Sequence, residues 1–250
     1  AVEAERRVLV NIAVLLVVLG GTLTSKTATA PAIAAQQLGS FLPSSPPITP
    51  VAPLYTPAMR FRLLETRSAL RPCSTRLPFR FGITTMTEAP LALLQVTIED
   101  EVGHTATGLS SDLLVPKWFA KNPESTIEED QRDLIRSLHD ACATLQESST
   151  ECATLFDHFW QVYGTQVAPL EATDLQRLVR GFGVAMVERA MFDAICRLAG
   201  LPFHEAIRCN LPGLRLDEID TTLAPWDPSS LPANPPATIG LRHTVGLLDA

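Results

Sequence analysis

The sequence predicts an α+β fold in which strands come first and helices follow. Apolar and polar residues alternate along residues 91–101, LALLQVTIEDE, where Leu94, Val96 and Ile98 share one side. After residue 123 the apolar residues recur instead at helical spacing, in three successive stretches. This change of period from two to about 3.6 residues predicts a sheet that is covered by helices later in the chain.

The front of this domain predicts a three-stranded antiparallel meander. Residues 59–71, MRFRLLETRSALR, place Phe61 and Leu63 on one face of a first strand, and residues 91–101 form the second. Turn residues around Gly103 in EDEVGHTATGL then lead into a third extended segment. A meander follows because short turns join neighbouring antiparallel strands.

The first helix is predicted to begin after Pro123, with Ser125 and Glu128 as a capping box. Glu128, Glu129 and Asp130 fall in its first turn, where negative charge favours the helix dipole. Its apolar stripe consists of Ile127, Leu134, Ile135, Leu138, Cys142 and Leu145.

Two more helices are predicted after this one. Ser148 and Glu151 are the cap expected for a helix over residues 152–163, which Gly164 should end. Another helix should begin near Thr173 or Asp174, with a possible interruption at Gly181 and Gly183 because glycine weakens a helix interior.

The last predicted helix ends at a defined point, since Gly200 and Pro202 both stop helices. A buried strand is then expected in PATIGLRHTVGLLDA, residues 236–250, with Ile239, Leu241 and Val245 on its apolar side.

Composition limits the class of protein. Of 250 residues, 46% are hydrophobic and 19% charged, which is enough apolar material for one or two packed domains. The net charge of −7 gives a phosphate backbone no reason to bind, so nucleic acid is excluded as an expected partner. Five scattered cysteines indicate neither a disulfide framework nor a metal site.

The first 57 residues differ from the rest. Arg6 and Arg7, an apolar run from Val8 to Leu19 and small residues after it have the layout of a signal peptide over residues 1–35. The alternative is an artefact of where the reading frame was opened, so export and a cytoplasmic location both stay open. Prolines concentrated between residues 43 and 57 predict a Pro-rich linker over residues 36–57.

Residues 77–111, LPFRFGITTMTEAPLALLQVTIEDEVGHTATGLSS, and residues 187–207, VERAMFDAICRLAGLPFHEAI, carry the most specific patterns in the chain. Both resemble the enolase superfamily, in particular its mandelate racemase and muconate lactonizing enzyme branch. The second stretch matches the family's A-x-x-D helix through Ala190 and Asp193, and its G-x-P exit through Gly200 and Pro202.

The resemblance implies a capping domain over residues 58–182 and the start of a (β/α) TIM-type barrel over residues 183–250. It also implies an enzyme that abstracts a proton alpha to a carboxylate, as a racemase, acid-sugar dehydratase or cycloisomerase. Mg²⁺ would stabilise the enolate, since a dication neutralises charge developing in the transition state.

A complete barrel takes about 200 residues or more, so the metal ligands and catalytic bases would lie beyond Ala250. No residue here is therefore assigned a catalytic or metal-binding role, and the chain reads as an inactive N-terminal fragment of a homo-oligomeric enzyme.

By the same resemblance, two loops of the capping domain would contact a small carboxylate substrate. The candidates are Phe81, Ile83, Thr84 and Thr85 in the early loop, and Lys117 and Trp118 in the later one, preceded by Ser110, Ser111 and Asp112. Lys117 would pair with the substrate carboxylate. For each residue singly, a core or turn role is an equal alternative.

A second class of function also fits the sequence. An α+β domain behind a signal peptide can be a secreted or membrane-tethered module that binds without catalysing a reaction. Acidic residues at the ends of successive downstream strands would favour the enzyme, and their absence would favour the binding module.

Overall fold

The computed structural model of the chain describes residues 58–81, 84–115, 117–169, 175–234, 238 and 240. The predicted signal peptide, the Pro-rich linker and the apolar residues of the predicted final strand lie outside these ranges. The strands are β1 Arg60–Arg71, β2 Ser74–Phe81, β3 Thr84–Glu88, β4 Leu91–Asp100, β5 Thr105–Leu113 and β6 Ala153–Thr154. The helices are α3 Ile127–Ser148, α4 Leu155–Gln166, α5 Arg177–Ala199 and α6 Phe203–Arg208, followed by the 3-10 turns η2 Leu216–Glu218, η3 Thr221–Leu223 and η4 Pro228–Ser230.

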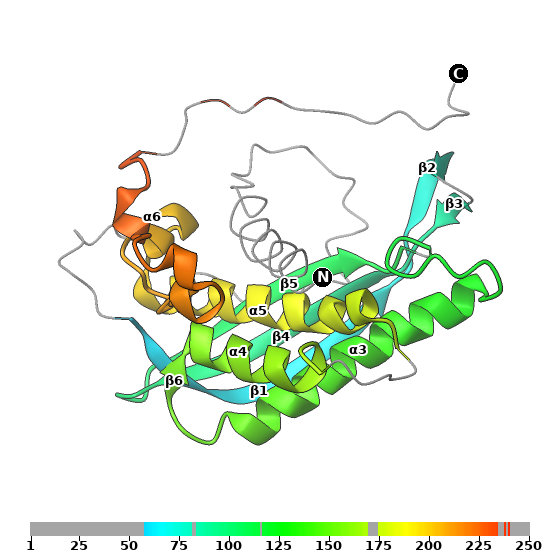
Figure 1. Ribbon diagram of the computed structural model, residues 1–250. Coiled ribbons are helices and arrows are strands. Elements are labelled where there is room, and N and C mark those ends of the chain that lie inside the picture. Colours follow the sequence, from blue (N-terminus) through cyan, green and yellow to red (C-terminus); the bar gives the residue numbers. More distant parts are fainter. Residues whose placement is uncertain are drawn as a thin grey trace.

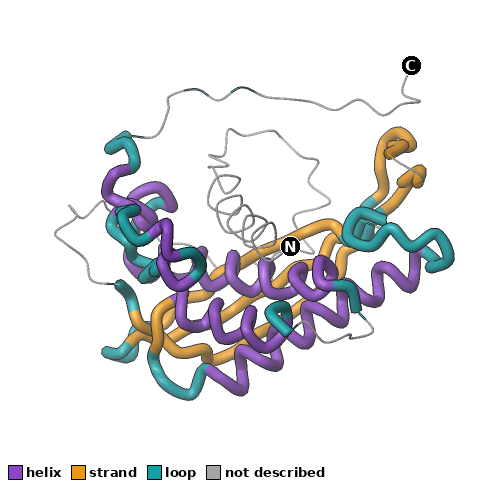
Figure 2. The backbone as a smooth tube through the Cα atoms, viewed as in Figure 1, coloured by secondary structure: helices purple, strands orange, loops and turns teal. Residues whose placement is uncertain are grey.

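The main sheet is antiparallel, with the strand order β5-β4-β1-β6. Helices α3, α4 and α5 cover one face of it (Figures 1 and 2). Leu94, Val96 and Ile98 of β4 and Phe61 of β1 are fully buried beneath the helices, which confirms the faces predicted from the alternating pattern. The described residues thus form an α+β domain in which one layer of helices covers the main sheet.

A second sheet of two strands, β2 and β3, interrupts the path from β1 to β4. This hairpin projects from one end of the main sheet (Figure 1). Thr84 and Thr85 were expected in a loop, but they begin strand β3. The hairpin was missed because its side chains are mostly exposed, so no core face imposes a regular alternation on the sequence.

Both predicted caps are displaced towards the C-terminus. Thr126 with Glu129 forms the capping box of α3, one residue after the expected pair, and Thr154 with Asp157 forms that of α4. The expected end of α4 at Gly164 is wrong. The helix continues to Gln166, because the backbone hydrogen bond from Val167 N to Tyr163 O (2.8 Å) closes a further turn.

Helix α5 runs without interruption through Gly181 and Gly183 and ends at Gly200, whose left-handed φ of 66° confirms the predicted stop. Pro202 then precedes the separate short helix α6. The boundary expected between residues 182 and 183 falls inside α5, and the expected start at residues 173–174 lies outside the described residues.

Two glycines allow α5 to pack closely against its neighbours. A Cβ on Gly108 of β5 would lie 2.0 Å from the carbonyl oxygen of Ala190, and one on Gly183 would lie 2.1 Å from that of Ser137 in α3. Hydrogen bonds hold both contacts: Leu109 N donates to Asp193 Oδ2 (2.9 Å), and Gly183 N donates to Ser137 Oγ (3.0 Å). Helix α5 is therefore in backbone contact with both β5 and α3.

Across the described residues, no helix combines the length and the apolar character needed to cross a membrane.

We predict that Gly108→Ala and Gly183→Ala each lower the free energy of unfolding by about 1–3 kcal/mol or more, because backbone atoms occupy the place of the added methyl group. Urea denaturation of the purified variants measures this loss. Gly181→Ala is the matched control, since no atom within 4 Å of its Cβ position opposes the change. It should leave stability unchanged or raise it by up to ~1 kcal/mol. Equal stabilities for all three variants would contradict the close packing of α5.

Candidate functional site

Three aromatic side chains from two distant segments meet at the end of the sheet where the hairpin projects. The ring centroid of Phe81 in β2 lies 5.7 Å from that of Phe79 and 5.8 Å from that of Trp118, and the rings of Phe81 and Trp118 meet edge to face. Trp118 follows β5 in the connection to α3 and is 61% exposed. We call Phe79, Phe81 and Trp118 the aromatic patch.

The structure brings several of the predicted substrate-contacting residues to this patch. Thr84 pairs directly with Phe81 in the hairpin, so it lies on the face of the patch, whereas Thr85 pairs with Arg80 on the opposite face. Ile83 lies outside the described residues.

Ser110 and Asp112 point elsewhere. The hydroxyl of Ser110 donates to Met186 O (2.7 Å), and Asp112 pairs with Arg189 (2.9 Å). Both side chains hold β5 against α5.

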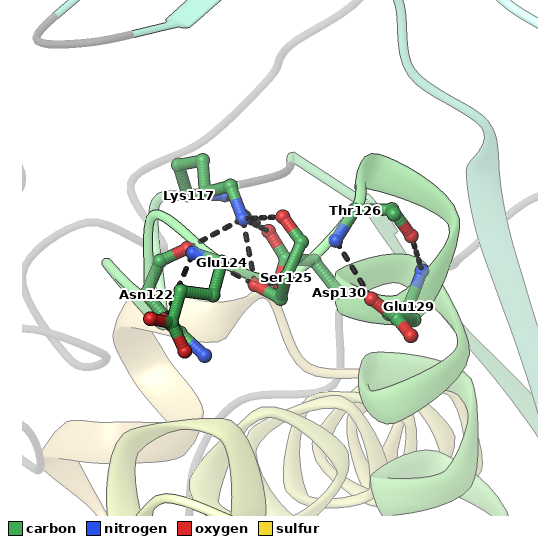
Figure 3. A network of polar contacts seen from close by, with 7 residues as sticks. All are labelled: Lys117, Asn122, Glu124, Ser125, Thr126, Glu129 and Asp130. Atoms are coloured by element: carbon green, nitrogen blue, oxygen red, sulfur yellow. Dashed lines mark hydrogen bonds and ion pairs between the residues drawn. The ribbon is translucent and has the colours of Figure 1, made fainter.

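Lys117 precedes Trp118, but its amine is directed into the protein (Figure 3). Nζ donates to Asn122 O (2.7 Å) and to both the hydroxyl (2.6 Å) and the carbonyl oxygen of Ser125, and pairs with Asp130 Oδ2 (3.1 Å). The side chains of Lys117 and Asp130 are only 10% and 6% exposed. We call Lys117, Asn122, Ser125 and Asp130 the lysine cage. A substrate carboxylate would have to displace these contacts to reach the amine.

Asp130 is the residue that sequence reasoning missed here. Its position in the first turn of α3 indicated only a favourable interaction with the helix dipole. In the structure Asp130 is buried and also accepts hydrogen bonds from Ser125 Oγ (2.6 Å) and Lys117 N (3.1 Å). No sequence signal marks this contact, because the partners are 13 positions apart and meet only through the way the segment between them folds back.

A small pocket lies between the lysine cage and the core. Its volume of about 10 Å³ is at the lower limit for one water molecule. Apolar Phe119, Leu134 and Val179 contribute to its lining. The pocket therefore has no room for a substrate.

The described residues do not fit a magnesium site. Among them, no group of three or more His, Cys, Asp or Glu side chains could hold a metal ion. His158 is buried in the core with Nε2 2.8 Å from Phe61 O, and burial lowers its pKa. Ligands for the Mg²⁺ implied by the family resemblance would have to come from outside the described ranges.

Glu188, on α5, has a carboxyl group with a raised pKa. Its Oε2 atom is buried without a hydrogen-bond partner in the described part of the chain, although other atoms of the residue are partly exposed. Burial raises the pKa of Glu188 to about 7, against a smaller opposing effect of the neighbouring Arg189 charge. This carboxyl group therefore changes charge near neutral pH.

The chain matches no family model and no curated protein. It is similar to solved structures of an enolase from Bradyrhizobium complexed with magnesium and mandelic acid, and of L-talarate/galactarate dehydratase from Salmonella typhimurium LT2. For the enolase the identity is 16% and the TM-score 0.38, with 58% of this chain and 34% of that chain covered. For the dehydratase the identity is 13% and the TM-score 0.33, with 75% of this chain and 38% of that chain covered. The chain thus spans little more than a third of the length of these structures.

We predict that Glu188→Gln raises the free energy of unfolding at pH 8 by about 1–3 kcal/mol and has little effect at pH 4. The folded pKa lies above the unfolded value, so the folded state binds the proton more tightly. Ionisation on going from pH 4.5 through 7 therefore destabilises the native protein. Urea denaturation across this range measures the effect, with Glu147→Gln on the exposed surface of α3 as control. A wild-type pH profile in Glu188→Gln would show that this acid is not perturbed.

Proposed function

We propose that the chain is the substrate-capping part of a metal-dependent enolase-superfamily enzyme that abstracts a proton alpha to a carboxylate. The observation that carries the proposal is the aromatic patch. A tryptophan that is 61% exposed, in contact with a phenylalanine from another segment, is a platform for a ligand rather than a piece of core.

The scaffold of the patch supports this assignment. Phe81 and Trp118 lie in a projecting hairpin and a connecting segment, while the sheet and helices beneath are closely packed. Rigid scaffolds with functional residues on their connections are the usual arrangement of binding sites. The aromatic faces suit the apolar part of a carboxylic acid substrate, and Thr84 supplies a hydroxyl group beside them.

Substrate orientation and catalysis would belong to two different parts of the enzyme. The described domain would orient the substrate and exclude water, and the metal and the catalytic bases would act from a (β/α) barrel. Mg²⁺, when bound there, would supply the positive charge that stabilises an enolate. Leu64, Leu70 and Leu77 are 47%, 52% and 56% exposed and offer apolar surface for the proposed homo-oligomer.

The reaction is tested with protein from the complete coding region, in deuterium oxide with Mg²⁺ and a panel of phenyl-bearing and polyhydroxy 2-hydroxy acids. We expect loss of the alpha-proton signal in the proton NMR spectrum of at least one acid, and no exchange with residues 1–250 alone. Exchange by residues 1–250 alone would contradict the division of work. No exchange by the complete product would favour the non-catalytic binding module, with or without export.

We predict that Trp118→Ala weakens binding of an aromatic carboxylate by about 3- to 10-fold, as expected for loss of one aromatic contact. Val102→Ala is the control, because Val102 is 76% exposed in the turn between β4 and β5. The measurement is a calorimetric titration of the complete protein with the acid identified in the exchange experiment. Equal affinities for both variants would remove the aromatic patch from the substrate site.

A further inference from the structure

Trp118 lies between two residues that are anchored to different helices. Lys117 is held by the lysine cage at the start of α3, and the ring of Phe119 packs edge-to-face on Phe182 of α5, with centroids 5.2 Å apart. The indole of Trp118 itself is mostly exposed and touches Phe81. The backbone that carries the indole is therefore held on both sides.

The backbone of Lys117 is unusual, since its φ of 59° lies in the left-handed region. A residue with a side chain adopts this conformation at a cost, and it persists where surrounding contacts over-determine it. Here one carboxylate makes two of these contacts, because Asp130 Oδ2 lies 3.1 Å from both the backbone nitrogen and the amine of Lys117. Asp130 thus fixes the turn immediately before Trp118.

Ser125 completes the arrangement. Its hydroxyl group accepts from Lys117 Nζ and donates to Asp130 Oδ1, at 2.6 Å in each case. The ammonium group has three hydrogens and four nearby oxygen atoms, so its buried charge is fully compensated. A neutral side chain at position 130 would leave this charge without its counter-ion.

We propose that the lysine cage is a positioning device that sets the orientation of Trp118 against Phe81, with Asp130 as its central residue. The consequence for substrate preference rests on the proposed function above. The orientation of Trp118 does not, because it is a property of the protein without ligand.

The orientation is tested by ¹⁹F NMR of the full 250-residue chain labelled with 5-fluorotryptophan. The chain has three tryptophans, and Trp118→Phe identifies the signal of Trp118. Phe81→Leu removes the ring next to the indole, so the Trp118 signal should shift. In Asp130→Asn we expect the Trp118 signal to move or broaden, and the shift caused by Phe81→Leu to be lost.

Glu128→Gln is the matched control, because it removes the same charge from the same helical turn at an exposed position. It should keep both the Trp118 signal and its dependence on Phe81. The signals of Trp160 and Trp226 report whether each variant is folded. If Asp130→Asn does not fold, Ser125→Ala takes its place, since it removes only the bridging hydroxyl group.

An unchanged Trp118 signal with an unchanged Phe81-dependent shift, in whichever of these two variants folds, would overturn the proposal. Failure of the exchange experiment would not affect this result, because no ligand is present. Where exchange is observed, Asp130→Asn should raise KM for the aromatic acid and leave kcat unchanged, and Glu128→Gln should alter neither.

Discussion

Helix α5 lies closer to β5 and to α3 than ordinary side chains would allow, and the position of the candidate site depends on this packing. Gly108 of β5 meets α5 at Ala190 and Ala194, and Gly183 of α5 meets α3 at Ser137 and Leu138. The segment that carries Trp118 begins at the end of β5 and ends at the start of α3, so both of its attachment points are fixed relative to α5. Phe119 adds a third contact to the same helix through Phe182. The connection is thereby held at its two ends and near its middle, which leaves the indole of Trp118 few directions to take.

The same packing gives a structural reason for the residues on which the family resemblance rests. Ala190 is small because its backbone faces Gly108, and Asp193 accepts a hydrogen bond from Leu109 N at the free edge of the sheet. An unpaired edge strand favours association with other chains, so an acid that occupies its donor also protects the fold. Gly200 ends the helix in a conformation that other residues adopt at a cost. These residues therefore have structural roles in α5. Their pattern predicts how this helix packs and ends, and it does not indicate a reaction.

The sequence predicted those features that depend on local order and failed where distant segments meet. The buried face of β4 and the end of α5 follow from periodicity and from one glycine, and both are confirmed. The interruption expected at Gly183 is wrong, because helix propensity describes an isolated helix and the contact with Ser137 requires a glycine there. Ser125 was expected as a helix cap and instead bridges Lys117 and Asp130, while the next residue, Thr126, takes the cap. Two neighbouring hydroxyl residues offer the same signal, and only the path of the preceding loop distinguishes them.

The candidate site illustrates how a surface can be defined by two segments that separate and meet again. The hairpin and the Trp118 connection start from adjacent points, since Leu91 pairs with Leu113 and the Leu114 amide donates to Pro90 O (2.8 Å). They meet again where Phe81 touches Trp118. Of the two, the connection is tied to buried groups through the lysine cage, whereas β2 and β3 are mostly exposed. Segments with few buried contacts open at lower free energy than the core. Under the proposed function, the hairpin would be the part of the aromatic patch that adjusts to a ligand, and Trp118 would be the fixed surface.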